Sequence, residues 1–296
     1  MDFEDLKMKV MILTLHSGEN EFPSCLESIK RQTHADITHK VFSGLGNWEA
    51  HNALYQTVME SSGDFDIFIK LDADMVFTRS TVVEEICGIF SSVNDLDHLV
   101  CSLEDWPSQR AIMGMHIFSN RVMWNTISDR LFVDPDPYVP GGKIVLSAKG
   151  VSFATHMASP SLEQAYLFGM HRALKVIQRE QPQIKVSQVR SQFVLLERIY
   201  DVWRVQPDVL RAAMLLGAER AFSSTEAYMK GKSSSVISHY DVQRVSSDEI
   251  CQDIEKLWGR RSLRRYIRKI RWHWLPVTTA RLKSPSLWDR LNFTKN

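Results

Sequence analysis

The chain has 296 residues, 44% of them hydrophobic and 24% charged, which is ordinary for a globular protein with a substantial core. Its apolar runs are too short for a membrane-spanning helix, and the run near the N-terminus is broken at Lys9 and His16, so neither a span nor a signal peptide is expected. The net charge of +1 conceals an acidic body and a basic tail: residues 256–288 hold ten Lys or Arg and no Asp or Glu, which leaves 26 basic against 35 acidic residues elsewhere.

Short apolar segments alternate with amphipathic segments through the first third of the chain. The periodicities predict strands at 9–15, 37–44 and 66–77 and helices at 23–32, 47–63 and 78–93. Pro23 suits the first turn of its helix, and Gly63 suits the end of the second helix. Strands that alternate with helices at this rhythm predict an α/β fold, in which a mostly parallel sheet is flanked by helices.

The pattern changes in the middle of the chain. Further strands are expected at 111–119 and 143–157, on either side of a stretch rich in turn residues, VDPDPYVPGG (133–142). From about residue 160 onward the periodicity is mainly helical. We therefore expect one domain over 1–180 and a mainly helical C-terminal region over 181–296.

Two carboxylates follow the third predicted strand, in the sequence IFIKLDADMVFT (67–78). Asp72 and Asp74 are separated only by Ala73, and on an ideal strand their side chains would point the same way. Two anions this close repel each other unless a cation lies between them. Mg²⁺ and Mn²⁺ suit such a pair, because these ions take oxygen ligands from one or two carboxylates and complete their coordination with water and substrate phosphates. The alternative is a solvated turn in which an aspartate caps the following helix.

Other polar residues also fall at the C-terminal ends of predicted strands. His16 and Ser43 follow the first two strands, as Asp72 and Asp74 follow the third. Ligands of open α/β sheets bind beyond the carboxyl ends of the strands. We therefore expect these side chains to converge on one rim of the sheet.

Two longer segments carry a resemblance to a known family. CLESIKRQT (25–33) and EAHNALYQTVMESSGDFDIFIKLDADM (49–75) resemble, in order and approximate spacing, the conserved helix and the D-x-D segment of family-2 glycosyltransferases with the GT-A fold. The resemblance implies a Rossmann-like GT-A domain over 1–180, which binds a nucleotide sugar and carries the catalytic site, and a helical extension over 181–296.

The resemblance also implies a function and its site. The chain would transfer a sugar, of the hexosyl type, from a nucleoside diphosphate donor to a glycan or a lipid-linked acceptor. Asp72 and Asp74 would hold Mn²⁺ or Mg²⁺ on the diphosphate, and Thr14, His16, Asn52 and Asp72 would contact the donor.

Two positions depart from the pattern of the family. An acidic residue usually follows the second strand and contacts the donor base, where this chain has SGLGN (43–47). The arginine that usually precedes Asn52 is His51 here. The identities of the donor base and the donor sugar are therefore left open.

A further metal ligand is also implied by the resemblance. Many GT-A enzymes supply a histidine from the region of KGVSFATHMASPS, and His156 is the candidate in this chain. The alternative is a histidine that is packed or solvated at the start of a helix. His171 lies within a helical pattern and is expected to be structural.

An inverting transferase needs a general base near the acceptor hydroxyl, usually a carboxylate. The resemblance places this base after the acceptor-side strand, where Asp134 and Asp136 stand among prolines that make the loop rigid. One of these two is the first candidate, and the alternative is ordinary turn chemistry, in which Asp and Pro are favoured. The neighbours Glu104 and Asp105 rank second. A retaining enzyme would need neither pair as a base.

The basic tail has an amphipathic pattern. Residues 259–276, GRRSLRRYIRKIRWHWLP, place apolar side chains on one helical face and basic ones on the rest. This composition is typical of helices that bind a membrane surface, where each basic residue contributes about 1 kcal/mol near anionic lipid. With four scattered cysteines that suit a reducing compartment, the tail predicts a cytoplasmic protein peripheral to the membrane. The alternatives are packing on the catalytic domain or, less favoured beside an acidic body, nucleic-acid binding.

Two rival functions are compatible with the same fold. A sugar-phosphate nucleotidyltransferase would carry a glycine-rich loop with Arg or Lys after the first strand, whereas HSGENEFPS (16–24) has one glycine and no basic residue. A non-catalytic membrane- or RNA-binding protein with a decayed transferase domain would account for the missing base-binding acid. The intact pair of Asp72 and Asp74 argues against such decay.

Overall fold

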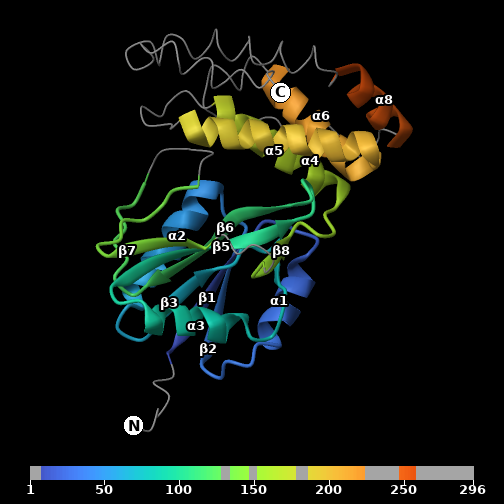
Figure 1. The fold of residues 1–296 in the computed structure, drawn as a ribbon. Helices are drawn as coiled ribbons and strands as arrows, with labels where there is room; N and C mark the ends of the chain where they lie inside the picture. Colours follow the sequence, from blue (N-terminus) through green and yellow to red (C-terminus); the bar gives the residue numbers. More distant parts are fainter. Residues whose placement is uncertain (1–7, 128–133, 147–151, 178–185, 224–246, 258–296) are drawn as a thin grey trace. The chain divides into compact units, whose positions relative to one another are not determined.

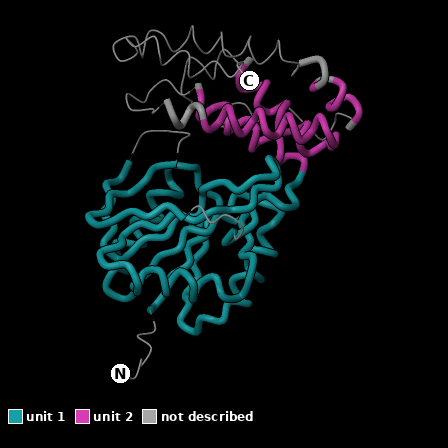
Figure 2. The backbone as a smooth tube through the Cα atoms, in the orientation of Figure 1, with its two compact units in different colours: residues 1–129, 134–161 teal, residues 130–133, 162–296 magenta. Residues whose placement is uncertain are grey.

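The computed structural model describes residues 8–127, 134–146, 152–177, 186–223 and 247–257. The chain divides into two compact units, unit 1 with residues 1–129 and 134–161 and unit 2 with residues 130–133 and 162–296 (Figure 2). The amphipathic tail predicted at 259–276 lies outside the described residues. The functional division at residue 180 stays a prediction.

Unit 1 is built on an eight-stranded sheet with the order β2-β1-β3-β6-β5-β8-β4, in which β7 also pairs with β5 (Figure 1). The strands are β1 (Val10–His16), β2 (Ile37–Ser43), β3 (Ile67–Lys70), β4 (Met75–Phe77), β5 (Leu96–Asp105), β6 (Arg110–Ser119), β7 (Gly142–Leu146) and β8 (Ala154–His156). β1 runs parallel to β2 and β3, and β5 runs parallel to β7 and β8. β6 runs antiparallel to β3 and β5, and β4 runs antiparallel to β8.

Helices cover both faces of this sheet. In unit 1 they are α1 (Phe22–Lys30), α2 (Asn47–Glu60) and α3 (Val82–Ser92). Residues alternate along β1, so that Val10 and Ile12 belong to the core with α1 and α3, whereas Met11 and Leu13 belong to the core with α2. The predicted α/β fold, a mostly parallel sheet flanked by helices, is therefore confirmed.

Two strands expected from the sequence are each divided in the structure. The expected strand over 66–77 becomes β3, which ends at Lys70, and β4, which begins at Met75. The residues between them form a turn, in which the Met75 amide donates a hydrogen bond to the Asp72 carbonyl (2.9 Å). The expected strand over 143–157 is represented by β7 and β8.

The structure also has a strand, β5, where the sequence pattern predicts none. β5 carries Asp97 and His98 inside the sheet, and these polar residues interrupt the apolar alternation by which strands are recognised. Burial of Asp97 is tolerated because Ser119 and Arg121 donate hydrogen bonds to its Oδ1 atom (2.5 and 2.7 Å).

The short link between β3 and β4 requires the sheet to curl. β4 lies four positions from β3 in the strand order, which in a flat sheet would be about 19 Å at the usual strand spacing. The chain from Lys70 to Met75 spans at most about 18 Å when fully extended, and the turn shortens it further. The far edge of the sheet therefore folds back toward the end of β3 and brings β8 with it.

Unit 2 contains, in its described part, α4 (Leu162–Ile177), α5 (Val186–Val205), α6 (Val209–Ser223) and α8 (Ser247–Leu257). The backbones of α4 and α6 touch at two glycines. A Cβ atom on Gly169 would lie 1.6 Å from the Met214 carbonyl oxygen, and one on Gly217 would lie 2.0 Å from the Tyr166 carbonyl oxygen. Any larger residue at these positions would push the two helices apart. Among the described helices, none combines the length and the apolarity that a bilayer crossing needs.

Candidate active site

Asp72 and Asp74 lie on a turn that is fixed by buried apolar neighbours. Leu71, Ala73 and Met75 are buried, whereas the two aspartates between them are partly exposed. Leu71 and Met75 belong to the core that α1 and α3 cover. The alternation places both carboxylates on the outer side of the turn, which we call the aspartate turn (residues 71–75).

Each aspartate is paired with a cationic side chain. Lys70 Nζ donates to Asp72 Oδ2 (2.8 Å), and His156 Nε2 lies 3.3 Å from Asp74 Oδ2. His156 ends β8, and in the antiparallel pairing of β4 with β8 it stands opposite Met75. The curl of the sheet thus brings a histidine from far along the chain to the aspartate turn.

His156 is oriented by Asp105, a carboxylate that, unlike Asp74, is fully buried. Asp105, at the end of β5, accepts a hydrogen bond from His156 Nδ1 (2.7 Å) on Oδ1 and hydrogen bonds from the amide (3.0 Å) and hydroxyl of Ser108 on Oδ2. Burial lowers the pKa of His156, but the charge of Asp74 and the contact with Asp105 outweigh burial and raise it to about 9. Burial raises the pKa of Asp105, but the hydrogen bond and charge of His156, together with the hydrogen bonds from Ser108, outweigh burial and lower it. His156 is therefore an imidazolium held between two carboxylates at neutral pH.

Lys70 is the positive centre on the other side of the aspartate turn. It ends β3, a strand that is otherwise apolar, and only 8% of its side chain is exposed. Burial lowers the pKa of Lys70, but the charges of Asp72, Asp134 and Asp74 outweigh burial and raise it above its usual value. Asp72 contacts this ammonium group directly, and Asp134 and Asp74 stabilise its charge without a contact.

Two histidines border Lys70, of which His51 is buried and His116 is partly exposed. Burial first, and the charge of Lys70 second, lower the pKa of His51 and lower that of His116 to about 3, so both rings are neutral at pH 7. His116 stands directly opposite Lys70 in the pairing of β3 with β6. Among the described residues, His51 Nε2 and Asp72 Oδ1 are buried without a hydrogen-bond partner. Because buried polar atoms normally have a partner, each of these two atoms has hydrogen-bonding capacity that the described side chains do not use.

The two candidate bases lie near this cluster. Asp134 and Asp136 are both exposed. Asp136 Oδ1 is 3.8 Å from His116 Nδ1, and Asp134 acts electrostatically on Lys70. The loop that carries them is therefore at the same end of the sheet as the aspartate turn, and their role as a base stays a prediction.

Asn52, expected to contact the donor, holds a loop in the structure. Its side-chain amide donates to the Ile127 carbonyl (2.8 Å). Its side-chain carbonyl accepts hydrogen bonds from Trp124 Nε1 and the Ile127 amide, both 3.0 Å long. Asn52 thus ties α2 to the segment after β6, and a contact with the donor stays a prediction.

Thr14 and His16 lie on β1. Thr14 is buried, and its hydroxyl is 3.0 Å from His39 Nε2. His16 lies at the strand end, where Nδ1 is 3.2 Å from Ser43 Oγ and the ring stacks on Phe22 at a centroid distance of 4.0 Å. His16 and Ser43 meet because β1 and β2 end side by side. Donor contacts by Thr14 and His16 stay predictions.

Lys70 was not identified from the sequence as part of the site, and Asp105 was considered only in another role. A lysine at the end of the strand IFIK was a usable signal, because lysine is almost never buried unless it is paired. Asp105 entered the sequence analysis only with Glu104, as a second-ranked base. In the structure Glu104 is exposed, whereas Asp105 is buried against His156.

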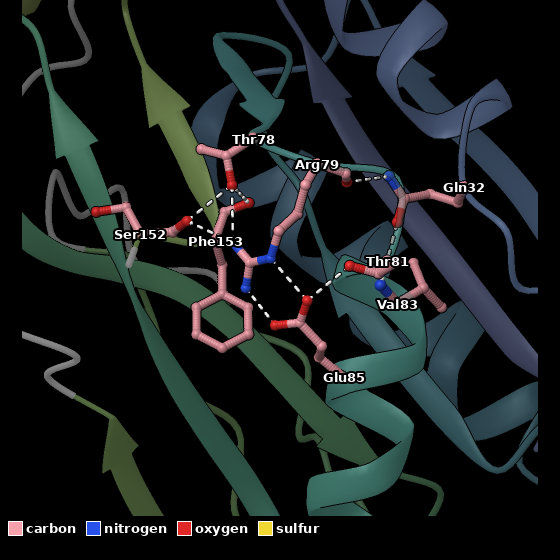
Figure 3. A network of polar contacts seen from close by, with 8 residues as sticks. All are labelled: Gln32, Thr78, Arg79, Thr81, Val83, Glu85, Ser152 and Phe153. Carbon is pink, nitrogen blue, oxygen red and sulfur yellow. Dashed lines mark hydrogen bonds and ion pairs between the residues drawn. The ribbon is translucent and has the colours of Figure 1, made fainter. Parts of the chain in front are cut away.

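A polar network fixes the start of β8 to the segment that follows the aspartate turn (Figure 3). Thr78 Oγ1 and Arg79 Nη1 both donate to the Ser152 carbonyl, at 2.7 and 3.0 Å. The Arg79 guanidinium also pairs with Glu85 of α3 and lies over the Phe153 ring, 5.2 Å from its centroid. Because Ser152 and Phe153 directly precede β8, the network holds that strand in register with the aspartate turn.

We expect Arg79→Met to lower the free energy of unfolding by about 1–2 kcal/mol, because a carbonyl and a carboxylate lose a charged donor at a partly exposed position. Arg110→Met changes an exposed arginine of β6 and is the matched control, with an expected effect below about 0.5 kcal/mol. Urea unfolding measures both variants. Equal stability of the two would contradict a stabilising role for the network.

The residues of the aspartate turn fit a divalent cation that is shared with a phosphate ligand. Asp72 and Asp74 offer hard oxygens, of which the buried Asp72 Oδ1 has no hydrogen-bond partner among the described residues. His156 lies beside Asp74, and its Nε2 atom becomes a ligand only when it gives up its proton to make room for the ion. No complete group of three or more His, Cys, Asp or Glu ligands is gathered within the described part of the chain. Water and phosphate oxygens would therefore supply the other ligands, as is usual for Mg²⁺.

A histidine pair beneath this site gives unit 1 a pH-dependent stability. His98 Nε2 of β5 is 3.0 Å from His116 Nδ1 of β6. Burial lowers the pKa of both to about 3; the next cause is the charge of His116 for His98 and that of Lys70 for His116, and Lys143 acts in the same direction on both. An unfolded histidine titrates near 6.5. Below that pH the unfolded chain binds protons that the folded chain does not, so this stability is present above pH 6.5 and is lost as the pH falls toward 3.

We expect the free energy of unfolding to fall between pH 6.5 and pH 4.5, by about 2 kcal/mol for each of these histidines. His98→Gln removes one titrating ring and keeps an amide that can donate to His116, so its stability should fall less over the same range. Urea unfolding at a series of pH values measures the two slopes. If wild type and variant lose stability in parallel, the pair does not control the acid response.

No model of a known protein family matches the sequence, and no curated protein matches it. Solved structures match weakly. A197 from STIV matches with 14% identity and a TM-score of 0.31, over 38% of this chain and 65% of its own. A glycosyltransferase involved in the glycosylation of the major capsid of PBCV-1 matches with 14% identity and a TM-score of 0.34, over 51% of this chain and 94% of its own.

The mannosyltransferase PcManGT from Pyrobaculum calidifontis, solved in complex with GDP-Man and Mn²⁺, matches over 94% of this chain and 88% of its own. Its identity is 8% and its TM-score is 0.35. At such values, none of these similarities bears on what the chain does, and its function has to be inferred from the site.

Proposed function

We propose that the chain is a glycosyltransferase of the GT-A type, which transfers a hexosyl group from a nucleoside diphosphate sugar with the help of Mn²⁺ or Mg²⁺. The observation that supports this most is the aspartate turn at the end of β3, where His156 Nε2 lies 3.3 Å from Asp74 Oδ2 and Lys70 pairs with Asp72. A sheet that gathers such ligands beyond the carboxyl end of a central strand suits a diphosphate.

Each residue of the cluster has a proposed part in holding the donor. Asp72 and Asp74 would hold the ion, and His156 would join them once its Nε2 proton is displaced. The bound ion neutralises charge on the leaving diphosphate. Asp105 keeps the His156 ring in place through the 2.7 Å hydrogen bond. Lys70 keeps a second positive charge beside the same oxygens. In a half-buried site these charges act more strongly than they would in water.

Asp134 and Asp136 are the proposed bases for the acceptor. In an inverting transfer, one of these carboxylates takes the proton of the acceptor hydroxyl while the acceptor oxygen bonds to the anomeric carbon and the bond from that carbon to the diphosphate breaks. Their exposure and their closeness to Lys70 and His116 support this role.

A glycan or lipid-linked acceptor and a cytoplasmic place at the membrane surface are proposed from the basic amphipathic sequence at 259–276. That segment lies outside the described residues. Cosedimentation with anionic liposomes, with and without residues 259–296, tests the proposal. Equal sedimentation of the two chains would contradict it.

The two rival functions have less support. The loop after β1 carries Glu19 and Glu21 and no Lys or Arg, so it would repel the triphosphate that a nucleotidyltransferase binds. A decayed domain would have no reason to retain buried charges that are paired as closely as Asp105 and His156.

The test is the thermal stability of the full chain with UDP, GDP, ADP, CDP and TDP, each with and without Mn²⁺. A ligand at 100 times its dissociation constant stabilises the folded chain by about 2.7 kcal/mol. We expect one of these diphosphates to raise the melting temperature by several degrees with Mn²⁺, and EDTA to remove the effect. No response to any diphosphate would reject the proposed function.

A further inference from the structure

Lys70 occupies one of the two carboxylate oxygens with which Asp72 could hold a metal ion, and the other, Oδ1, has no hydrogen-bond partner among the described residues. Its Nζ atom lies 2.8 Å from Asp72 Oδ2, and 8% of the Lys70 side chain and 29% of the Asp72 side chain are exposed. An ion that approaches Asp72 must therefore compete with the ammonium group of Lys70. Because Lys70 belongs to the same chain, this competitor is always present beside Asp72. Because the pair is largely shielded from water, this competition is stronger than it would be at the protein surface.

The surroundings of Lys70 allow its ammonium group to change partners. His51 and His116 are neutral neighbours, and Asp134 acts on Lys70 from the loop above. The lysine stem is flexible, and its three donors are not restricted to one plane, so that Nζ can leave Asp72 Oδ2 when another anion is close. A diphosphate beside the aspartate turn would be such an anion.

We propose that Lys70 couples the binding of the divalent ion to the binding of the diphosphate. Its ammonium group pairs with Asp72 Oδ2 and opposes a metal ion that arrives alone. When the nucleotide arrives, the ammonium group turns to a phosphate oxygen, which frees Asp72 Oδ2 so that both carboxylate oxygens can face the ion. This inference rests on the proposed function, because it needs a diphosphate at the aspartate turn. It goes further by naming a residue that makes each ligand depend on the other.

The coupling has a measurable form. If the diphosphate raises the affinity for Mn²⁺ by some factor, Mn²⁺ raises the affinity for the diphosphate by the same factor. Removal of Lys70 should reduce this factor from both directions. A residue that only positions Asp72 would behave differently. Its loss would weaken the binding of both Mn²⁺ and the diphosphate and would leave the coupling factor nearly unchanged.

The experiment compares the full-length wild type with Lys70→Met and Lys70→Arg by calorimetry. Mn²⁺ is titrated alone, and UDP, GDP, ADP, CDP and TDP are titrated with and without Mn²⁺. We expect Lys70→Met to bind Mn²⁺ alone about tenfold more tightly, because a competing charge is gone. We also expect it to bind the diphosphate roughly 10- to 100-fold more weakly, because a charged hydrogen bond is gone. Lys70→Arg should stay closer to wild type in both.

The outcomes separate the role of Lys70 from the proposed function. Unchanged affinity for the diphosphate in Lys70→Met, or weaker binding of Mn²⁺ alone, would overturn the role of Lys70 and leave the proposed function intact. A wild-type chain that binds none of the five diphosphates would overturn both. Lys70→Gln keeps an uncharged donor for Asp72 and gives the same comparison if Lys70→Met does not fold, which circular dichroism would reveal.

Discussion

Replacement of Asp74 with asparagine should reduce sugar transfer by roughly a thousandfold or more, while the melting temperature changes by only a few degrees. Asparagine preserves the shape of the side chain but removes the negative charge that would hold the ion. His156 keeps its hydrogen bond to Asp105 (2.7 Å), so β8 should keep its place. Turnover of the donor, Mn²⁺ affinity and thermal unfolding together check this prediction.

Asp64→Asn is the matched control for Asp74→Asn. Asp64 is an exposed aspartate between α2 and β3, and its replacement makes the same change in charge outside the site. The control should transfer sugar at the wild-type rate. If Asp74→Asn remains active, or if the wild type works in EDTA, the metal role of the aspartate turn is wrong.

Replacement of Asp105 with asparagine should affect both stability and the site. The buried imidazolium of His156 would lose its charged acceptor on Nδ1, and Ser108 would lose an acceptor for its amide and hydroxyl. We expect the free energy of unfolding to fall by roughly 3 kcal/mol, because one partner of a buried ion pair is removed. Affinity for Mn²⁺ should fall about 10- to 100-fold, as is usual when the partner that orients a histidine ligand is lost.

Glu104→Gln is the control for Asp105→Asn. Glu104 precedes Asp105 on β5 and is exposed, so that the same change in charge occurs on the opposite side of the strand. Urea unfolding and Mn²⁺ calorimetry should find this variant close to wild type. If Asp105→Asn loses stability but keeps full Mn²⁺ affinity, Asp105 supports the fold and does not position His156 for the ion.

The parts of the fold that could be predicted are those with an unbroken periodicity. The strand expected at 9–15 corresponds to β1, which is apolar on both faces, and the helix expected at 47–63 corresponds to α2, which buries one apolar face. β5 could not be predicted in this way. Its buried Asp97 is compatible with a strand only because Ser119 and Arg121 satisfy it, and both belong to a later part of the chain.

For the candidate site as well, the parts that depend on neighbouring residues could be predicted from the sequence, and the parts that depend on distant residues could not. Asp72 and Asp74 stand in a local motif, and Lys70, which pairs with Asp72, is only two residues away at the end of β3. The contact of Asp105 with His156 has no local signal. It depends on the parallel pairing of β5 with β8, and that pairing depends on the curl of the whole sheet.

The aspartate turn also ties the edge strand β4 to the interior strand β3, so its length is as constrained as its chemistry. A chain with such a connection cannot accept inserted residues at this point, because each added residue would loosen the link between β3 and β4 and displace the carboxylates. Changes that adapt the site to another ligand would therefore have to occur in other segments at the C-terminal ends of the strands. The segment SGLGN (43–47), which joins β2 to α2, does not hold two distant strands together. Insertions or substitutions are therefore tolerated better there, both in engineering and in natural variation.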